Sequence, residues 1–251
     1  MTLISTGHEN TDNGEVWGIV GGMGPLASAE FVNSIYRDTA RWTEQESPTV
    51  ILLSDPTVPD RTECLLSGRH EILLQKLTGS VETLLAIGAT RIIVCCLTIH
   101  PLIHQLPPAL REKIVSLVDL TLDAVQRSRS RHLLLCTNGT KKLRLFQQHR
   151  LWDETQHKVV LPDDQDQDAI HQMLYEIKNQ REAITYIPFV EELMKKYEVS
   201  SYIAGCTEMH IVAKAHEQFS GHDRRKFCID PLTEILPMMQ RNVLTSAGHA
   251  G

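Results

Sequence analysis

The feature that most constrains the fold of this 251-residue chain is a repeat, because its second half follows the same order of segments as its first. Short runs rich in Val, Ile and Leu alternate with longer segments whose apolar residues recur at helical spacing. Such runs are typical of strands buried on both faces of a parallel sheet, and their alternation with helices indicates right-handed βαβ units. We predict eight strands, four in each half, at residues 16–22, 49–55, 90–96, 114–120, 132–138, 158–164, 200–206 and 226–232.

The residues that follow the predicted strands also match between the halves. Three pairs stand 115, 110 and 111 residues apart: Gly24 and Gly139, Cys96 and Cys206, and Asp119 and Asp230. We therefore predict an α/β fold of two similar Rossmann-like domains, each with a four-stranded, mostly parallel sheet, related by a pseudo-two-fold axis. Because open parallel sheets bind ligands beyond the carboxyl ends of their strands, the site is expected in the cleft between the domains.

Composition argues against several classes of function. The net charge is −6 and no long block of Lys and Arg occurs, so nucleic acid is not an expected partner. No apolar run approaches the ~18 residues of a membrane span. Residues 1–14 lack the features of a secretory signal and are predicted to be a flexible polar leader. We expect a cytoplasmic protein with six reduced cysteines, and the lack of a zinc-ligand spacing argues against a metal site.

Two cysteines close strands at equivalent positions. Cys96 begins the stretch C-L-T-I-H and Cys206 begins C-T-E-M-H, and both lead into a predicted helix. The positive end of a helix dipole and its free N–H groups stabilise a thiolate, so both thiols are candidates for chemistry. The alternative for either cysteine is packing, because a free cysteine is commonly a small buried hydrophobe.

From about Val16 to about Met239, the sequence resembles the aspartate/glutamate racemase family, in its aspartate racemase branch. The segments that carry the resemblance are GIVGGMGPLAS (18–28), VPDRT (58–62), CCLTIH (95–100), TNGT (137–140), AGCTE (204–208) and IDPLTEIL (229–236). The resemblance implies an isomerase that inverts an amino-acid α-carbon with two cysteines, without pyridoxal phosphate or another cofactor.

The resemblance also implies how the chain divides. In the family the final strand segment crosses back to the first domain. We therefore expect a first domain of residues 15–117 and 227–247 and a second domain of residues 118–226. The resemblance further suggests a homodimer.

Two thiols suit the implied reaction. Racemisation removes a proton from one face of the α-carbon and returns one to the other face, so one thiol must be ionised while the other is protonated. A free thiol has a pKa of about 8.5, which suits both roles near neutral pH. The carbanion needs electrostatic stabilisation around the α-carboxylate. The candidates for this carboxylate cradle are Thr98, Thr137, Asn138, Gly139, Thr140 and Thr207.

Two cations are candidates for recognising the side chain of an acidic substrate. Arg61 in VPDRT matches the arginine with which the family holds the distal carboxylate, and Lys178 matches a second cationic contact. The alternatives are a surface arginine after a proline turn and a solvated helix lysine. Met23 is expected either to line the cleft through its backbone and packing or to fill the core.

The first cysteine motif departs from the family at Leu97, where the family usually has Asn. Leucine has no hydrogen-bonding group, so Leu97 predicts a substrate other than aspartate, or weak activity. Cys95 adds a neighbouring thiol, but alignment through Thr98 and His100 assigns the acid/base role to Cys96. The remaining cysteines are predicted to be packing residues: Cys64, Cys136 and Cys228.

Three further polar residues stand close to the thiols. Glu208 is expected to orient a proton or to bind the substrate amino group, with a helix-cap role as the alternative. His100 and His210 each follow a site cysteine by four residues, and we expect helix packing in preference to tuning of the thiol pKa. His100 and His104 form an HxxxH pair without an evident third ligand, so no metal is expected.

The leading hypothesis is a racemase acting on an acidic amino acid: aspartate, glutamate or a relative. One alternative is another cofactor-independent isomerase or decarboxylase of the same superfamily. The other is a non-catalytic amino-acid-binding homologue, which Leu97 suggests. Two cysteines favour racemisation, since a one-sided decarboxylase needs only one proton donor.

Overall fold

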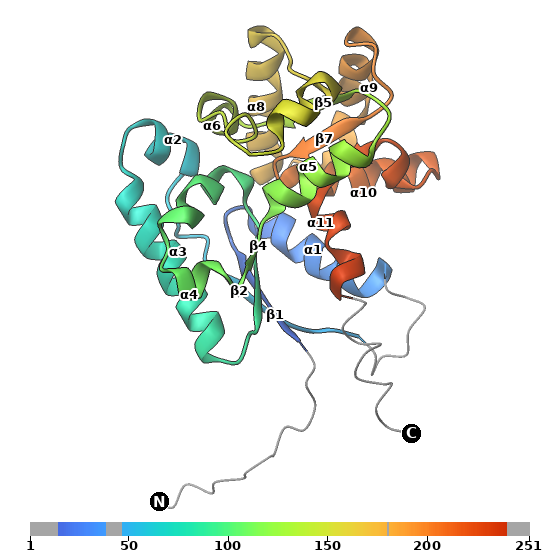
Figure 1. The fold of residues 1–251 in the computed structure, drawn as a ribbon. Helices are drawn as coiled ribbons and strands as arrows, with labels where there is room; N and C mark the ends of the chain where they lie inside the picture. Colours follow the sequence, from blue (N-terminus) through green and yellow to red (C-terminus); the bar gives the residue numbers. More distant parts are fainter. Residues whose placement is uncertain (1–14, 39–46, 180, 240–251) are drawn as a thin grey trace, which may run out of the picture.

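The computed structural model describes residues 15–38, 47–179 and 181–239. The leader predicted at residues 1–14 and the last part of the predicted first domain, residues 240–247, lie outside the described residues. Within the described part, the chain forms two four-stranded parallel sheets, one in each half (Figure 1).

The two sheets have the same topology, which confirms the predicted fold class. The first has the order β2-β1-β3-β4 and the second has the order β6-β5-β7-β8, with every pairing parallel. The strands are β1 (Val16–Gly21), β2 (Thr49–Ser54), β3 (Arg91–Val94), β4 (Ile114–Val115), β5 (His132–Cys136), β6 (Val159–Val160), β7 (Tyr202–Gly205) and β8 (Cys228–Ile229).

Helices connect the strands and cover the sheets. They are α1 (Pro25–Asp38), α2 (Arg61–Leu66), α3 (His70–Ala86), α4 (Pro108–Arg111), α5 (Leu117–Arg127), α6 (Asn138–Lys142), α7 (Trp152–Thr155), α8 (Asp164–Lys178), α9 (Ile187–Lys196), α10 (Glu208–Ser220) and α11 (Pro231–Glu234). The 3-10 helices are η2 (Leu97–Gln105), η3 (Gln156–Lys158), η4 (Ala183–Tyr186) and η5 (Arg224–Lys226). None of the helices in the described ranges has both the length and the apolar composition needed to cross a bilayer.

The structure corrects the strand predicted at residues 114–120. Only Ile114 and Val115 pair in the sheet. The Ser116 hydroxyl then accepts a hydrogen bond from the backbone N–H of Asp119 at 3.1 Å and caps α5. The apolar residues from Leu117 onward are therefore helical, because a serine cap starts the helix within the apolar run.

The final strand lies in the second sheet, as the prediction of four strands in each half requires. β8 pairs with β7, so this strand does not cross back to the first domain as the family resemblance implied. Leu232 of α11 then packs in the cluster that holds Phe31 and Ile35 of α1 together with residues of the second half. Figure 1 shows α11 lying beside α1.

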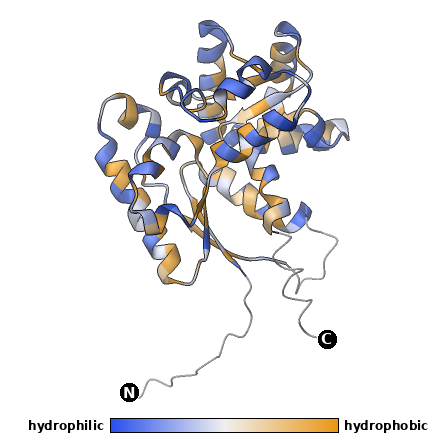
Figure 2. Cartoon of the chain, in the orientation of Figure 1, coloured by the Kyte–Doolittle hydropathy of each residue, from blue (hydrophilic) through white to orange (hydrophobic). Residues whose placement is uncertain are grey.

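One hydrophobic cluster joins the two halves. It includes Trp17 of β1 and Phe31 of α1 from the first half, and Leu134 of β5 and Ile203 of β7 from the second. Figure 2 shows apolar residues along the strands and on the helix faces that meet them. Because the cluster is shared, the carboxyl ends of the two sheets are held in a fixed relation, and that relation positions the candidate site.

Candidate active site

Both candidate thiols stand where a central strand ends. Cys96 follows β3 and precedes η2, and Cys206 follows β7 one residue before the cap of α10. The two residues are 5% and 4% exposed. Side chains alternate along a strand, so Cys95 points into the core cluster of Trp17 while Cys96 packs on the opposite face. This alternation supports Cys96, and not Cys95, as the site thiol.

The Cys206 thiol is bound to Glu208, the first residue of α10. It donates a hydrogen bond to Glu208 Oε2 at 2.7 Å. Burial and then the Glu208 carboxylate raise the pKa of Cys206 well above its ordinary value, and the nearby Cys96 thiol acts in the same direction. The expectation that a helix N-terminus would favour the thiolate is wrong for Cys206, because desolvation and the carboxylate outweigh the helix dipole. Cys206 therefore keeps its proton in the resting protein.

The other oxygen of Glu208, Oε1, is buried and has no hydrogen-bond partner in the structure. It lies against Gly24, in the turn that follows β1. A Cβ atom at position 24 would come within 2.0 Å of Oε1. The turn requires glycine at this position because any side chain would displace the carboxylate.

Arg61, at the start of α2, is buried and not the surface residue of the alternative interpretation. It is 9% exposed. Its Nη1 donates to the carbonyl oxygens of Val58 and Pro59 at 3.2 and 3.1 Å, and its Nη2 donates to that of Met23 at 2.8 Å. Three carbonyl groups thus fix the guanidinium, and Met23 contributes to the site through its backbone.

The site holds two cations that form no close ion pair with a carboxylate among the described residues. Lys178, at the end of α8, is half-buried with its Nζ 4.6 Å from the centre of the Tyr175 ring. Burial opposes the charge of both Arg61 and Lys178, but Glu208 and Cys96 act to raise both pKa values, so both groups stay charged. Neither cation takes part in an ion pair with N–O distance within 4.0 Å among the residues described.

Three threonines of the predicted carboxylate cradle lie together. Thr98 Oγ1 is 3.0 Å from Thr137 Oγ1 and 3.2 Å from Thr140 Oγ1, and the last two are also 3.2 Å apart. Gly139 allows this approach, since a Cβ atom there would come within 2.7 Å of Thr62 Oγ1 and 3.0 Å of Thr98 Cγ2. The cluster joins the two halves and provides uncharged hydroxyl donors.

The remaining cradle candidates lie apart from this threonine cluster. The Asn138 side chain donates to Asp168 Oδ1 at 2.8 Å, which directs it toward α8. Thr207 Oγ1 donates to the Cys95 carbonyl at 3.5 Å, across the interface between the halves. Leu97 is 1% exposed and packs in the shared core with Trp17. The residue that replaces the usual asparagine is therefore a core residue.

His100 positions the backbone of Cys96. Its Nε2 accepts a hydrogen bond from the backbone N–H of Leu117 at 3.3 Å, so its Nδ1 carries the proton and donates to the Cys96 carbonyl at 2.8 Å. Burial lowers the pKa of His100 to about 4, and the ring is neutral at pH 7. Both nitrogens are occupied by backbone groups, so His100 packs and orients, as expected, and does not exchange protons with the thiol.

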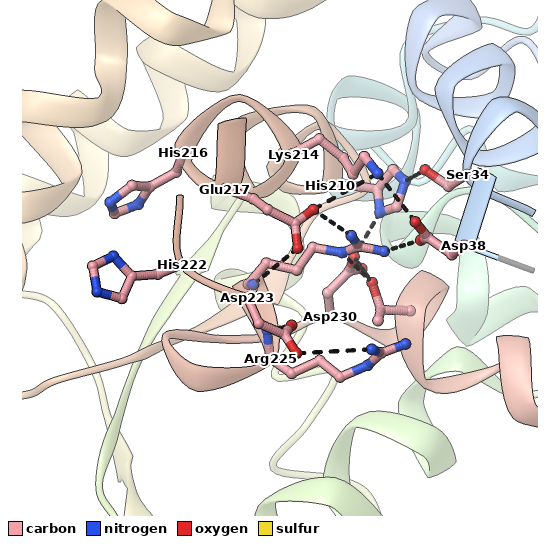
Figure 3. Close-up of polar contacts among 12 residues, drawn as sticks. Ser34, Asp38, His210, Lys214, His216, Glu217, His222, Asp223, Arg225 and Asp230 are labelled. Carbon is pink, nitrogen blue, oxygen red and sulfur yellow. Dashed lines mark hydrogen bonds and ion pairs between the residues drawn. The ribbon is translucent and has the colours of Figure 1, made fainter. Parts of the chain in front are cut away.

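His210 belongs to a polar network between the halves (Figure 3). Its Nδ1 lies 2.6 Å from Asp230 Oδ2 and its Nε2 lies 2.9 Å from the Ser34 hydroxyl on α1. The order Ser–His–Asp is that of a hydrolase triad, but all three residues are at most 2% exposed. A substrate cannot reach the buried hydroxyl, so this triad is structural.

The same network holds α10 against α1. Asp38 accepts hydrogen bonds from Arg224 and, at 3.3 Å, from Lys214 Nζ (Figure 3). Burial disfavours the charge of Asp38, but Arg224 and Lys214 outweigh it and lower the pKa of the carboxyl group. Because α10 begins with Glu208 and the turn before α1 contains Gly24, the network also fixes the contact between these two residues.

Asp60 and Tyr175 were not predicted from the sequence as site residues. They connect α2 with α8, the helices that carry the two cations. The Tyr175 hydroxyl donates to Asp60 Oδ2 at 2.6 Å, and Asp60 Oδ1 caps α2 by accepting from the Glu63 N–H at 2.7 Å. The spacing of Asp60 and Glu63 is a cap signal, and Tyr175 lies one helical turn before Lys178. Their contact joins residues 115 positions apart, which no local pattern indicates.

The fold and the site together define a class of protein in which two parallel α/β halves bring paired thiols and paired cations to their interface. The family model for Asp/Glu/hydantoin racemase matches residues 20–235, and the chain belongs to this family. The resemblance found in the sequence is confirmed. Among the described residues, no group of three His, Cys, Asp or Glu side chains could hold a metal ion.

Solved structures share the fold along most of their length. The chain is similar to the Picrophilus torridus aspartate racemase, with 22% identity, a TM-score of 0.77, and coverage of 92% of this chain and 94% of that one. An aspartate racemase homologue from Pyrococcus horikoshii gives 18% identity, a TM-score of 0.61, and coverage of 93% and 99%. The Francisella tularensis glutamate racemase in complex with D-glutamate gives 14% identity, a TM-score of 0.55, and coverage of 94% and 83%.

Proposed function

We propose that the protein racemises an acidic amino acid, aspartate or glutamate or a close relative, by a two-thiol reaction without pyridoxal phosphate. The observation that carries the proposal is the pair of cations, Arg61 and Lys178, which stay charged beside Cys96 and Cys206 and form no ion pair within 4.0 Å among the described residues. Buried charges in proteins are normally paired. A substrate with two carboxylates would provide the missing partners.

The cations and the threonine cluster suit the two ends of such a substrate. Arg61, held by three carbonyl groups, presents its remaining N–H donors to the distal carboxylate. The hydroxyls of Thr98, Thr137 and Thr140 are donors for the α-carboxylate, whose charge grows as the α-proton leaves. Lys178 adds a second positive charge to the same site.

The contact between Cys206 and Glu208 supports a division of roles between the two thiols at the start of turnover. Cys206 holds its proton on Glu208, so it is the proton donor. Cys96 then takes the α-proton from one face of the α-carbon, and the bonding electrons stay on the substrate as a carbanion. Cys206 gives its proton to the opposite face, which leaves Cys96 as thiol and Cys206 as thiolate. The reverse reaction starts from that second state, as a two-base racemase requires.

The proposal is tested by incubating the wild-type protein in D₂O with each enantiomer of aspartate and glutamate. We expect one deuterium at the α-carbon of the product of inverted configuration, seen by mass spectrometry and chiral chromatography. A decarboxylase would release CO₂ and a shortened amino acid. A non-catalytic binding protein would leave the α-hydrogen unexchanged. Either of these results, without inversion, would overturn the proposal.

A further inference from the structure

The unpartnered oxygen of Glu208 stands out among the buried polar groups of the site. One carboxylate oxygen accepts a hydrogen bond from the Cys206 thiol, while Oε1 has no partner among the described residues although Glu208 is 1% exposed. Burial of a carboxylate oxygen without a donor is unfavourable, so such a group calls for a ligand. We propose that Glu208 Oε1 binds the α-ammonium group of the substrate while Oε2 holds the Cys206 proton. This inference rests on the proposed function and specifies how its substrate is recognised.

Neither neighbouring cation pairs with Oε1 among the described residues, which leaves this oxygen for a ligand. Arg61 directs three of its hydrogen bonds to the carbonyl groups of Val58, Pro59 and Met23. Lys178 lies over the Tyr175 ring. No ion pair with Glu208 occurs among the residues that the structure describes.

The charges of the site then complement an acidic amino acid sign for sign. Arg61 and Lys178 are two positive groups, and Glu208 is one negative group. The substrate carries two carboxylates and one ammonium. A dicarboxylate that lacks the ammonium would satisfy the two cations but leave Oε1 unpaired, so Glu208 would discriminate against it.

Repeat symmetry supports this assignment independently. Thr98 and Glu208 are equivalent positions, each two residues after a site cysteine. Gly139 lies against Thr98, and Gly24 lies against Glu208, so each half places a glycine beside this position of the other half. This equivalent position therefore carries a hydroxyl donor, Thr98, in the first half and a carboxylate acceptor, Glu208, in the second half. An α-carboxylate and an α-ammonium need those two chemistries.

Binding of the ammonium would also prepare Cys206 to react. Glu208 raises the pKa of the Cys206 thiol, and a cation on Oε1 offsets that carboxylate charge. The thiol would then release its proton more readily once an amino acid is bound. Glu208 would therefore couple recognition of the amino group to the proton donor beside it.

The inference is tested with Glu208→Gln by isothermal titration of ligand pairs that differ in the ammonium. The pairs are L-aspartate with succinate and L-glutamate with glutarate. The glutamine carbonyl can still accept the Cys206 thiol, but its NH₂ group then replaces Oε1 and faces the ammonium. We expect amino-acid affinity to fall about 10- to 100-fold, as for loss of a charged hydrogen bond, while dicarboxylate affinity stays within about threefold.

Two further variants keep the test decisive. Glu192→Gln, at an exposed position on α9, is the matched control and should change neither affinity. If Glu208→Gln does not fold, Glu208→Asp replaces it in the test. The shorter side chain keeps the negative charge but moves it away from the bound ammonium, so amino-acid binding should weaken while dicarboxylate binding does not. Equal losses for amino acids and dicarboxylates, or no loss for either, would overturn the inference. Since binding needs no turnover, selective loss in a protein without racemase activity would uphold the inference and reject the proposed function.

Discussion

The two halves of the molecule share a topology but surround their thiols with different chemistry. Cys96 is followed by Leu97 and Thr98, and Cys206 is followed by Thr207 and Glu208. The first half provides the Thr98 hydroxyl and a neutral histidine that binds backbone groups. The second half provides a carboxylate that accepts the thiol and a histidine in a charged network. The frame is therefore symmetric while the surroundings of the thiols differ, and this difference is the basis of the proposed division of roles.

The two histidines show how equivalent positions come to differ. His100 binds the Cys96 carbonyl and the Leu117 N–H within its own half. His210 binds Asp230 and reaches Ser34 of the other half. The first half therefore fixes its cysteine backbone locally, whereas the second half fixes a whole helix against its neighbour. A substitution that shifts α10 should therefore displace Glu208, whereas a substitution near His100 should displace only Cys96.

The larger of two stability effects concerns Leu97, which stands where the second half has Thr207. Leu97→Asn should destabilise the protein by about 3 kcal/mol, because it removes apolar packing and buries an unpaired amide. The Tm should fall by roughly 6–12 °C for a chain of this size, as measured by calorimetry. Leu97→Met, which conserves volume, should cost less than about 1.5 kcal/mol. A stable Leu97→Asn variant with altered preference between aspartate and glutamate would show that this side chain faces the substrate.

A smaller effect concerns Asp38, which holds the helix of the second half. Its pKa is lowered below 3.8, so its stabilising contribution is full above that value and is lost as the pH falls through the lowered pKa. Asp38→Asn should cost about 1 kcal/mol at pH 7, since the pair is partly solvent-screened, and the difference should shrink as the pH falls below 3.8. Urea unfolding at pH 7, 5, 4 and 3 measures this.

The exposed Asp153 provides the control for the Asp38 experiment. Asp153→Asn should follow the wild type across the same pH range. A deficit in Asp38→Asn that is constant down to pH 3 would show that the charge of Asp38 does not hold the two helices together.

Much of the fold follows from local sequence signals. All eight strands lie within the apolar runs that predicted them, because a strand buried on both faces must be apolar along its length. The ends of the strands were less predictable. β4 and β8 have only two residues each, because Ser116 and Asp230 cap the helices that begin directly after them. The repeat predicts the place of β8 in the second sheet, because it assigns four strands to each half.

The site was predictable where chemistry is local to a motif. The thiols, Arg61 and Lys178 are found from motifs that match a family. The burial of Leu97 could not be predicted from its motif. A shift of one residue along the segment after a strand changes the face on which a side chain lies. The second oxygen of Glu208 was also beyond reach, since its isolation depends on Gly24 in the other half of the chain.

The central claim, that two thiols in unlike surroundings divide one proton transfer, is tested by removing them singly. Cys96→Ser and Cys206→Ser are incubated in D₂O with each aspartate and glutamate enantiomer, and the α-hydrogen is followed by NMR. Both variants should lose racemisation by about 10²- to 10⁴-fold. Cys206→Ser, which keeps the base Cys96, should still exchange the α-hydrogen of one enantiomer without inverting it. Racemisation at the wild-type rate in both variants would contradict the account.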